Sequence, residues 1–478
     1  MKTAATKYFA FAITLGVVML GGCAALVGPL PPTREPNASW ADAPAGATLR
    51  RDQLARWWEG FHDEELSKQI DEALAGNVDL QIAAARVREA RAGATVAAST
   101  LWPTLNLDAF GGRNKDLSRL PVKPAIGNIA TLGLSAQWEI DLLGGNRAGA
   151  QAAERQATAA ADLDNAARVL LAGEVGSTLF AQRGTAAQLA TLRRNVQVAE
   201  EALRLAQERF ARGLATALDV DRALTQHKTL EAQVPLLQGQ LKELGHRLAV
   251  LRGHTPGGEA PSARPVPETL PELPRLLPSE WLDARPDLEA VRHQVEAANF
   301  ALAEARSDLF PKFTLLASGG RERIALLGLP ALSANIFALG AGLVQPIFDA
   351  GRIRAQVDGA DARLALTAAS YDRTLLKAIE EVENAYVAFD TAEKQQEELR
   401  AARDIALRAR ERAAALYQRG LVDYGAYLDT QRVALQTEDA LIQATTRKAI
   451  ALVALYRAFG GGIGVQSAAA ATAEATPR

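Results

Sequence analysis

Leu101-Trp102-Pro103-Thr104-Leu105 recurs 208 residues later as Leu309-Phe310-Pro311-Lys312-Phe313. Two further landmarks recur at an offset of 207: Gly144 and Arg147 as Gly351 and Arg354, and Phe210-Ala211-Arg212-Gly213-Leu214 as Tyr417-Gln418-Arg419-Gly420-Leu421. Three landmarks in one register indicate a structural unit that is built twice, and such a repeat has to be recognised before a fold is assigned.

The composition limits the classes of partner. The 478 residues include 53 basic and 55 acidic side chains, so no net field draws the chain to nucleic acid. Length alone would allow about three domains, but the duplication favours one double-length architecture with tails. Aromatic residues make up only 5%, which suits helices that pack closely along their length.

The N-terminus is typical of an exported protein. Lys2 and Lys7 precede an apolar stretch at 8–20, which is too short to span a bilayer, and the stretch ends in Leu20-Gly21-Gly22-Cys23. Small residues before the only Cys resemble a bacterial lipobox, so we expect a signal peptide at 1–22 and a lipid on Cys23. The alternative is an ordinary signal peptide with an incidental Cys. No other cofactor is expected.

Each repeat begins with two strands. Residues 131–141 alternate apolar and polar side chains with period two, and 104–109 do the same. We predict strands at about 103–113 and 130–141, with an exposed loop around 111–128, and at about 311–321 and 334–346. The alternative is a pair of surface hairpins on a soluble domain. Trp102, Trp138 and Phe310 lie near strand ends, where outer-membrane barrels carry aromatic girdles.

Each repeat continues as a helical hairpin. Residues 146–212 and 352–419 contain no Pro and have a heptad-like pattern, which predicts helices of about 100 Å. Gly213 and Gly420 are expected to end them. Returning helices follow at 217–252 and 424–459, and Pro235 should kink or break the first of these.

The remaining segments complete the predicted organisation. We expect an extended arm at 23–60, a first repeat at 61–254 and a Pro-rich linker at 255–278. A second repeat covers 279–460, and 461–478 is expected to be a disordered tail. Within the first repeat, helical periodicity over 62–100 is interrupted near Gly76-Asn77.

No catalytic constellation occurs in the sequence. It has no Walker A motif, nucleophile elbow, His-Glu-x-x-His or paired CxxC. The five His residues are scattered, so we predict no metal site and no enzyme.

Closure of the strands requires more than one copy. No run of 18 apolar residues follows Cys23, so a mature chain that crosses a membrane must do so as a closed β-barrel. Such barrels have at least about eight strands, and one chain supplies four. Three copies give a twelve-stranded barrel continued by an α-helical barrel, although a dimer or tetramer also satisfies the arithmetic.

Several segments, in this order and with the lipobox, resemble one family over residues 23–460. They are Trp57-Trp58-Glu59-Gly60-Phe61, Asn77-Val78-Asp79-Leu80, the two Trp/Phe-Pro strand starts, Trp138-Glu139-Ile140-Asp141-Leu142, Arg285-Pro286-Asp287-Leu288, Gln345-Pro346-Ile347-Phe348-Asp349-Ala350-Gly351-Arg352 and Gly420-Leu421-Val422-Asp423-Tyr424. The chain resembles the TolC-like outer-membrane factors, in the NodT-type lipoprotein branch of multidrug efflux.

The resemblance implies a fold and a function. The fold is mainly α with a small β-barrel portion, assembled as a homotrimer in the outer membrane and extending into the periplasm. The trimer would be a passive conduit for drugs or other small toxic compounds. Its partners would be a periplasmic adaptor, a proton-driven inner-membrane transporter and outer-membrane lipid. Metal-ion efflux, type I protein secretion and a pore-less coiled-coil scaffold remain alternatives.

The family closes its periplasmic end near the hairpin tips, which implies candidate gate residues here. By position they are Asp423, Tyr424, Tyr427, Asp429, Arg212, Asp219 and Asp221. Gly213, Leu214, Gly420 and Leu421 are candidate contacts for the adaptor. The alternative is that these charges are solvated or serve the helix dipoles. Some relatives have a second acidic residue where this chain has Ala426. The second tip is the one expected to move.

Overall fold

The computed structural model describes most of the chain. The described residues are 26–32, 34, 39–41, 54–115, 126–257, 262, 264–271, 273, 278, 281, 285–326 and 330–461. The predicted signal peptide, Cys23, most of the predicted arm and residues 462–478 lie outside them. The chain divides into two compact units: Met1–Arg34, Ala85–Ala161 and Glu289–Arg373 form the first, and Glu35–Ala84, Asp162–Leu288 and Thr374–Arg478 the second.

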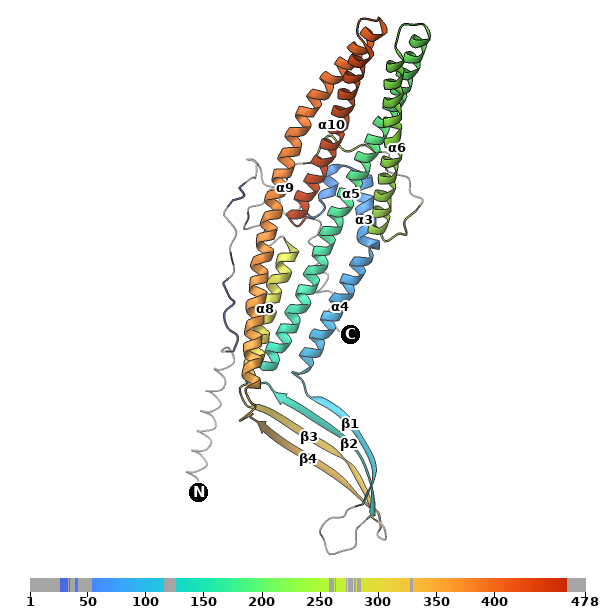
Figure 1. The fold of residues 1–478 in the computed structure, drawn as a ribbon. Coiled ribbons are helices and arrows are strands. Elements are labelled where there is room, and N and C mark those ends of the chain that lie inside the picture. The colour runs from blue at the N-terminus through green and yellow to red at the C-terminus, as the bar shows by residue number, and fades with distance from the viewer. Residues whose placement is uncertain are drawn as a thin grey trace. The chain divides into compact units, whose positions relative to one another are not determined.

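The first unit contains the sheet. In the described part of the chain, β1 (Thr104–Lys115), β2 (Ile126–Ile140), β3 (Lys312–Leu326) and β4 (Leu332–Val344) form one antiparallel sheet in the order β1-β2-β3-β4 (Figure 1). The two predicted strand pairs are present, but their bounds differ from those predicted. Pairing extends β1 to 115, starts β2 at 126 and carries β3 to 326, so the predicted loop around 111–128 is shorter. Backbone hydrogen bonds continue the ladder through Gly and polar residues where the alternation fades.

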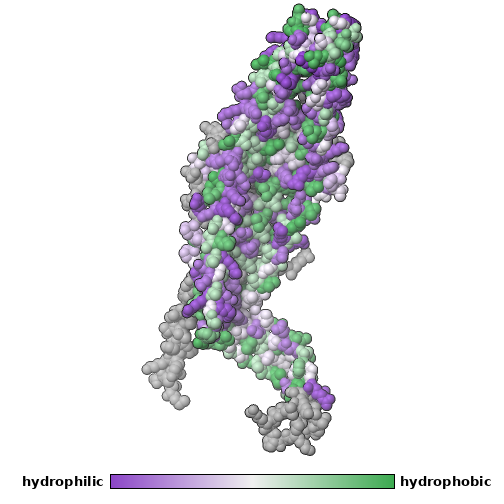
Figure 2. Space-filling view, in the orientation of Figure 1, coloured by the Kyte–Doolittle hydropathy of each residue, from purple (hydrophilic) through white to green (hydrophobic). Residues whose placement is uncertain are grey.

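The register separates two faces, because residues that pair across strands share a face. We define the apolar face by Leu105, Leu107, Leu134, Trp138, Leu315, Phe337, Leu339 and Leu343. We define the polar face by Thr104, Asn106, Asp108, Ser135, Gln137, Glu139, Thr314 and Ser318, although this face also carries Phe110, Leu316, Ile336 and Val344. On the apolar face, Leu107 is 70% and Leu339 86% exposed. Green and pale residues cover much of the visible sheet region in Figure 2. A row of exposed apolar side chains along one face of a sheet is typical of a surface that contacts another protein or a membrane.

Each strand of the first unit joins a helix. The chain runs from α4 (Val78–Ser99) into β1, from β2 into α5 (Gly145–Ala211), from α8 (Pro286–Ser307) into β3, and from β4 into α9 (Arg352–Gln418). Both long helices begin in the same way. Asp141 accepts a hydrogen bond from Arg147 N (2.8 Å), and Asp349 accepts one from Ile353 N (2.9 Å). A carboxylate at a helix N-terminus satisfies free N–H groups, and the Ile353 hydrogen bond lowers the pKa of Asp349.

The second unit has an aromatic core. It includes η1 (Trp57–Phe61), α3 (Glu64–Gly76), α6 (Ala217–Leu251) and α10 (Tyr424–Ala458). Trp57 is 2% exposed and stacks on Tyr456 with 5.5 Å between ring centroids. The end of the predicted extended arm is therefore a short helix in the core. Its Trp pair belongs to the packing, which residue composition alone did not indicate.

The α6 helix is continuous through Pro235, so of the predicted kink or break the break does not occur. Pro removes one hydrogen bond and crowds the preceding turn, but residue 235 is exposed, so water can satisfy the freed carbonyl. None of the helices in the described part of the chain has both the length and the apolar character needed to cross a membrane.

A buried ion cluster ties α5 to the start of α3. The Arg183 side chain is 0% exposed, and it pairs with Asp63 and with Glu65 (2.8 Å). Asp63 also caps α3 by accepting hydrogen bonds from Glu65 N (3.1 Å) and Leu66 N (3.2 Å). Burial alone would raise the pKa of Asp63, but the hydrogen bond and charge of Arg183 outweigh it, and the pKa falls below its usual value.

Replacing Arg183 with Met is expected to lower the free energy of unfolding by about 3–5 kcal/mol, because two carboxylates lose their buried partner. Urea unfolding followed by circular dichroism measures the change. Arg56→Met is the matched control: Arg56 pairs with Asp71 at 3.2 Å, but both side chains are half exposed, and such pairs contribute under about 1 kcal/mol. Equal losses in the two variants would contradict the prediction.

Candidate gating site at the hairpin tips

The two helical hairpins turn with the same geometry. We call α5–α6 the first hairpin and α9–α10 the second (Figure 1). Gly213 and Gly420 both have φ of 73°, a conformation that glycine adopts without strain. Leu214 N bonds back to Arg209 O (2.8 Å), and Leu421 N to Leu416 O (3.0 Å). The helices therefore end within one residue of the predicted positions.

The returning helices differ in how they are capped. Thr216 and Asp219 form a reciprocal capping box at the start of α6. The backbone N–H of Thr216 donates a hydrogen bond to the Asp219 carboxylate (2.9 Å), and this bond lowers the pKa of Asp219. At the equivalent place in α10, Asp423 accepts a hydrogen bond from Ala426 N (2.7 Å). Both caps satisfy N–H groups that the first helical turn leaves free.

A tyrosine cluster joins the two hairpins. Tyr417, Tyr424 and Tyr427 of the second hairpin are buried together with Ala202, Ala206 and Ala223 of the first. The rings of Tyr417 and Tyr427 are stacked, with 5.6 Å between centroids and 4° between planes. Burial raises the pKa of all three hydroxyls further above physiological pH. The alanines leave the space that these rings fill.

Arg209 links the same hairpins through polar contacts. Its Nη1 donates a hydrogen bond to the backbone O of Tyr417 (2.8 Å), and its guanidinium carbon lies 4.8 Å from the centre of the Tyr417 ring. The first contact fixes the end of α9 and the second adds a cation–π interaction. We refer to these two contacts as the Arg209 latch.

Some buried polar atoms at this junction have no hydrogen-bonding partner among the described residues. They include the Tyr417 hydroxyl, Arg209 Nε and both side-chain polar atoms of Gln431. A buried polar group without a partner costs about 1–3 kcal/mol.

The structure brings only some of the predicted gate residues together. Tyr424 and Tyr427 lie in the tyrosine cluster, and Asp219 is partly buried in its cap. The other predicted residues are exposed: Arg212, Gly213, Leu214, Asp221, Gly420, Leu421, Asp423 and Asp429. Asp429 pairs with Arg432 at 3.3 Å within α10. The tyrosines therefore pack as a core in the single chain, and the carboxylates serve helix ends or face solvent.

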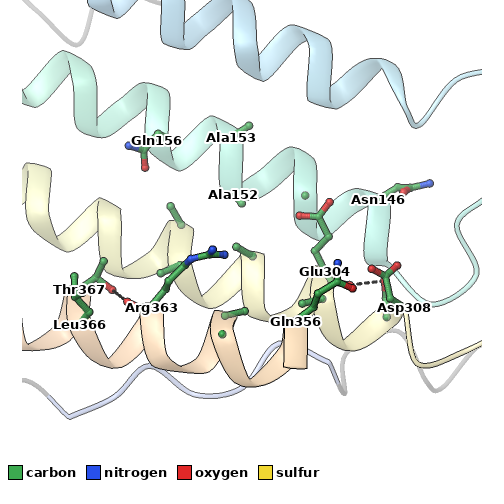
Figure 3. Close-up of a pocket in the computed structure, with 18 of the residues that line it drawn as sticks. Asn146, Ala152, Ala153, Gln156, Glu304, Asp308, Gln356, Arg363, Leu366 and Thr367 are labelled. Atoms are coloured by element: carbon green, nitrogen blue, oxygen red, sulfur yellow. Dashed lines mark hydrogen bonds between the residues drawn. The ribbon is translucent and has the colours of Figure 1, made fainter. Parts of the chain in front are cut away.

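A groove of about 1330 Å³ lies in the first unit, between α5, α8 and α9. Ala and Gly make up nearly half of its lining residues, and Figure 3 shows Glu304 of α8 and Asp308, which follows α8, at one end. Burial, and then the charge of Asp308, raise the pKa of Glu304. Lys312, on the polar face of the sheet, lines the same groove and contacts Asp308 at 2.8 Å. The groove and the polar face are thus continuous.

The opposite side of α8 holds the N-terminal segment. Asn299 Nδ2 donates to Gly28 O (2.8 Å). At 100° per residue, Asn299 points away from Ala301, which lines the groove. Near the end of the first unit, Arg34 N donates to Asp372 at 3.1 Å. The described start of the chain therefore runs along the side of these helices that faces away from the groove.

Comparison with known proteins decides the family. The family described as "Outer membrane efflux protein" matches residues 69–254 and 277–461. The outer membrane protein OprJ of Pseudomonas aeruginosa is 31% identical over 95% of this chain and 96% of its own length. The pyoverdine export outer membrane protein OpmQ of the same species is 32% identical, over 93% and 95%.

The chain belongs to the outer membrane efflux protein family.

A solved structure agrees with this assignment. The outer-membrane channel OprN superposes with a TM-score of 0.84 at 29% identity, and the match covers 92% of this chain and 100% of that one. The expected fold class and family are confirmed, as is the expectation that the chain is a channel protein of the outer membrane and not an enzyme. The family resemblance predicted Tyr424 and Tyr427 as gate residues from their positions in the chain. They did not indicate Arg209, whose partner is a backbone carbonyl that no sequence pattern shows.

Arg209→Ala is expected to loosen the junction between the hairpins of this efflux protein, because the guanidinium holds both the Tyr417 carbonyl and its ring. Nitroxide labels on the exposed Leu214 and Leu421 positions report the distance between the tips by pulsed electron resonance. We expect a broader distance distribution in the variant. Arg204→Ala, which removes an exposed pair with Glu208 in the same helix, should leave the distribution unchanged. An unchanged distribution in Arg209→Ala would contradict the role of the Arg209 latch in holding the two hairpins together.

Proposed function

We propose that three copies of this chain close into the outer-membrane conduit of a tripartite efflux pump. The conduit docks a periplasmic adaptor and a proton-driven inner-membrane transporter, and it passively exports drugs and other small toxic compounds. The sheet is the observation that carries this proposal. Among the described residues, β1 and β4 each pair on one side only. Open edges do not persist in hydrocarbon, and three copies would supply twelve strands, within the range of closed outer-membrane sheets.

The two sides of the first unit differ in polarity, as the inside and the outside of a conduit in a membrane would. The polar face and the groove share one side, which suits a water-filled lumen. The apolar face suits lipid, and it carries the 86% exposed Leu339. Gly28 lies on the side of α8 away from the groove. A lipid on Cys23, five residues earlier, would then insert from outside the conduit.

The hairpin tips would form the periplasmic closure. The Arg209 latch and the tyrosine cluster hold the second hairpin against the first, so release of these contacts would widen the opening. Threefold assembly would turn Asp423 and Asp429 on the second tip into rings of three carboxylates. The candidate gate residues on the first tip are Arg212, Asp219 and Asp221. The exposed turns at Gly213-Leu214 and Gly420-Leu421 would be available to the adaptor.

Purified oligomer in a planar lipid bilayer is expected to show discrete single-channel conductance. Asp423→Ala with Asp429→Ala should raise the open-state conductance, because the α10 cap and two carboxylate rings are lost. Asp390→Ala, at an exposed pair with Lys394 in α9, is the control and should match the unchanged protein. Folded oligomer without conductance, even with the tip substitutions, would exclude a channel.

Cys23 is expected to carry the lipid anchor. It is the only Cys of the chain, so radiolabelled palmitate fed to expressing cells should label the protein, and Cys23→Ala should abolish the label. Stable anchoring takes more than one acyl chain, and the variant should therefore also be extracted more easily from membranes. Labelling that survives the substitution would contradict the assignment.

A further inference from the structure

The repeat fixes the register of strand pairing as well as the order of the strands. In the β1·β2 ladder Leu107 pairs with Leu134. Shifting the first residue by 208 and the second by 207, the offsets of the sequence repeat, gives Leu315 and Ala341, which pair in β3·β4. The same shifts convert Thr104↔Gln137 into Lys312↔Val344. The second strand pair therefore reproduces the register of the first.

The β2·β3 ladder is the seam between the two repeats. A seam between copies would join β4 of one copy to β1 of the next. In the repeat, β4 is equivalent to β2 and β1 is equivalent to β3. We propose that this seam forms in the register that the β2·β3 ladder dictates. Gly340 of one copy then faces Gly112 of the next, Gly342 faces Phe110 and Val344 faces Asp108. The inference rests on the proposed assembly of three copies and assigns its contact residues.

A glycine pair fits this register, and a register shifted by two residues would instead pair Gly342 with Gly112, so the crosslinking test below has to distinguish the two. Gly133 and Gly320 pair in the β2·β3 ladder. A Cβ at Gly320 would lie 2.6 Å from Gly133 Cα, and a Cβ at Gly133 would lie 2.9 Å from Gly319 O, so the two strands approach too closely for side chains. The transferred register places Gly340 opposite Gly112, another glycine pair, at the equivalent point.

Within one copy, no neighbouring atom requires a glycine at position 340. A Cβ built on it meets no atom within 4 Å, so any residue would fit there in the isolated chain. Gly112 differs, because a Cβ there would meet the Phe110 ring at 2.8 Å within the same chain, so only the glycine at 340 lacks a reason inside one copy. A neighbouring backbone that approaches as closely as β3 approaches β2 would explain it.

The same register covers exposed apolar side chains. Ile140 pairs with Phe313 in the seam between repeats, and both are partly buried. The equivalent residues are Ile347 and Leu105, which are 92% and 68% exposed in the single chain. Pairing between copies would place them opposite one another. The faces also agree: Val344 and Asp108 both lie on the same face as Ser318 and Gln137.

Engineered disulfides in the full-length chain test the register, because a disulfide needs Cα atoms within about 7 Å. The test variant carries Val344→Cys with Asp108→Cys. Two variants shifted by two residues carry Val344→Cys with Asn106→Cys or with Phe110→Cys. Gln137→Cys with Leu316→Cys, the equivalent pair within one copy, is the positive control. Each single substitution controls for random collision, and mild oxidation in outer-membrane vesicles is followed by non-reducing electrophoresis.

We expect Val344→Cys with Asp108→Cys to shift most of the chain from monomer to covalent dimers and trimers, and the shifted pairs to give only traces. The positive control should form its bond without a change in mass. Oligomers that crosslink best, or equally well, in a shifted pair would overturn the register while leaving the assembly intact. Absence of any product between chains, with monomer alone after mild detergent extraction, would overturn the register and the proposed function together.

Discussion

The edges of the four-stranded sheet impose the constraint on which the rest of the molecule depends. Among the described residues, β1 and β4 each leave one row of backbone N–H and C=O groups without a strand partner. In hydrocarbon no water can satisfy these groups, and each would cost several kcal/mol. Unpaired edges of this kind support the proposed assembly from more than one copy. Because the chain is duplicated, the kind of strand pairing that joins β2 to β3 within one copy can also join β4 of one copy to β1 of the next.

The same duplication organises the helices and then departs from symmetry at their tips. Both long helices begin at an Asp cap and end at a glycine with φ of 73°. At the tips, the second hairpin supplies three large aromatic rings and the first supplies alanines that receive them. Arg209 adds a contact that runs from the first hairpin to the second. Release would therefore expose tyrosines on one hairpin and a shallow alanine surface on the other.

Sequence reasoning located the elements well where periodicity and glycine act locally. Gly213 and Gly420 set the helix ends, and the alternation around Leu134 identified β2. It failed where tertiary contacts decide. Ladder pairing extends β3 to Leu326, the exposed position of Pro235 lets α6 continue, and the pair Trp57-Trp58 enters the core. At the tips, the predicted gate residues Tyr424 and Tyr427 pack together with Tyr417, and their role in gating stays a prediction. Arg209 was missed because its partner is a backbone carbonyl.

Amide hydrogen exchange of the lipid-embedded protein tests the central claim most directly. Closure of the sheet between copies predicts that amides of β1 and β4 are protected as strongly as those of β2 and β3, because every strand then has two partners. The comparison is internal to one sample, so differences in lipid or temperature affect all four strands alike. Fast exchange along the outer rows of β1 and β4, with protection confined to β2 and β3, would contradict the account.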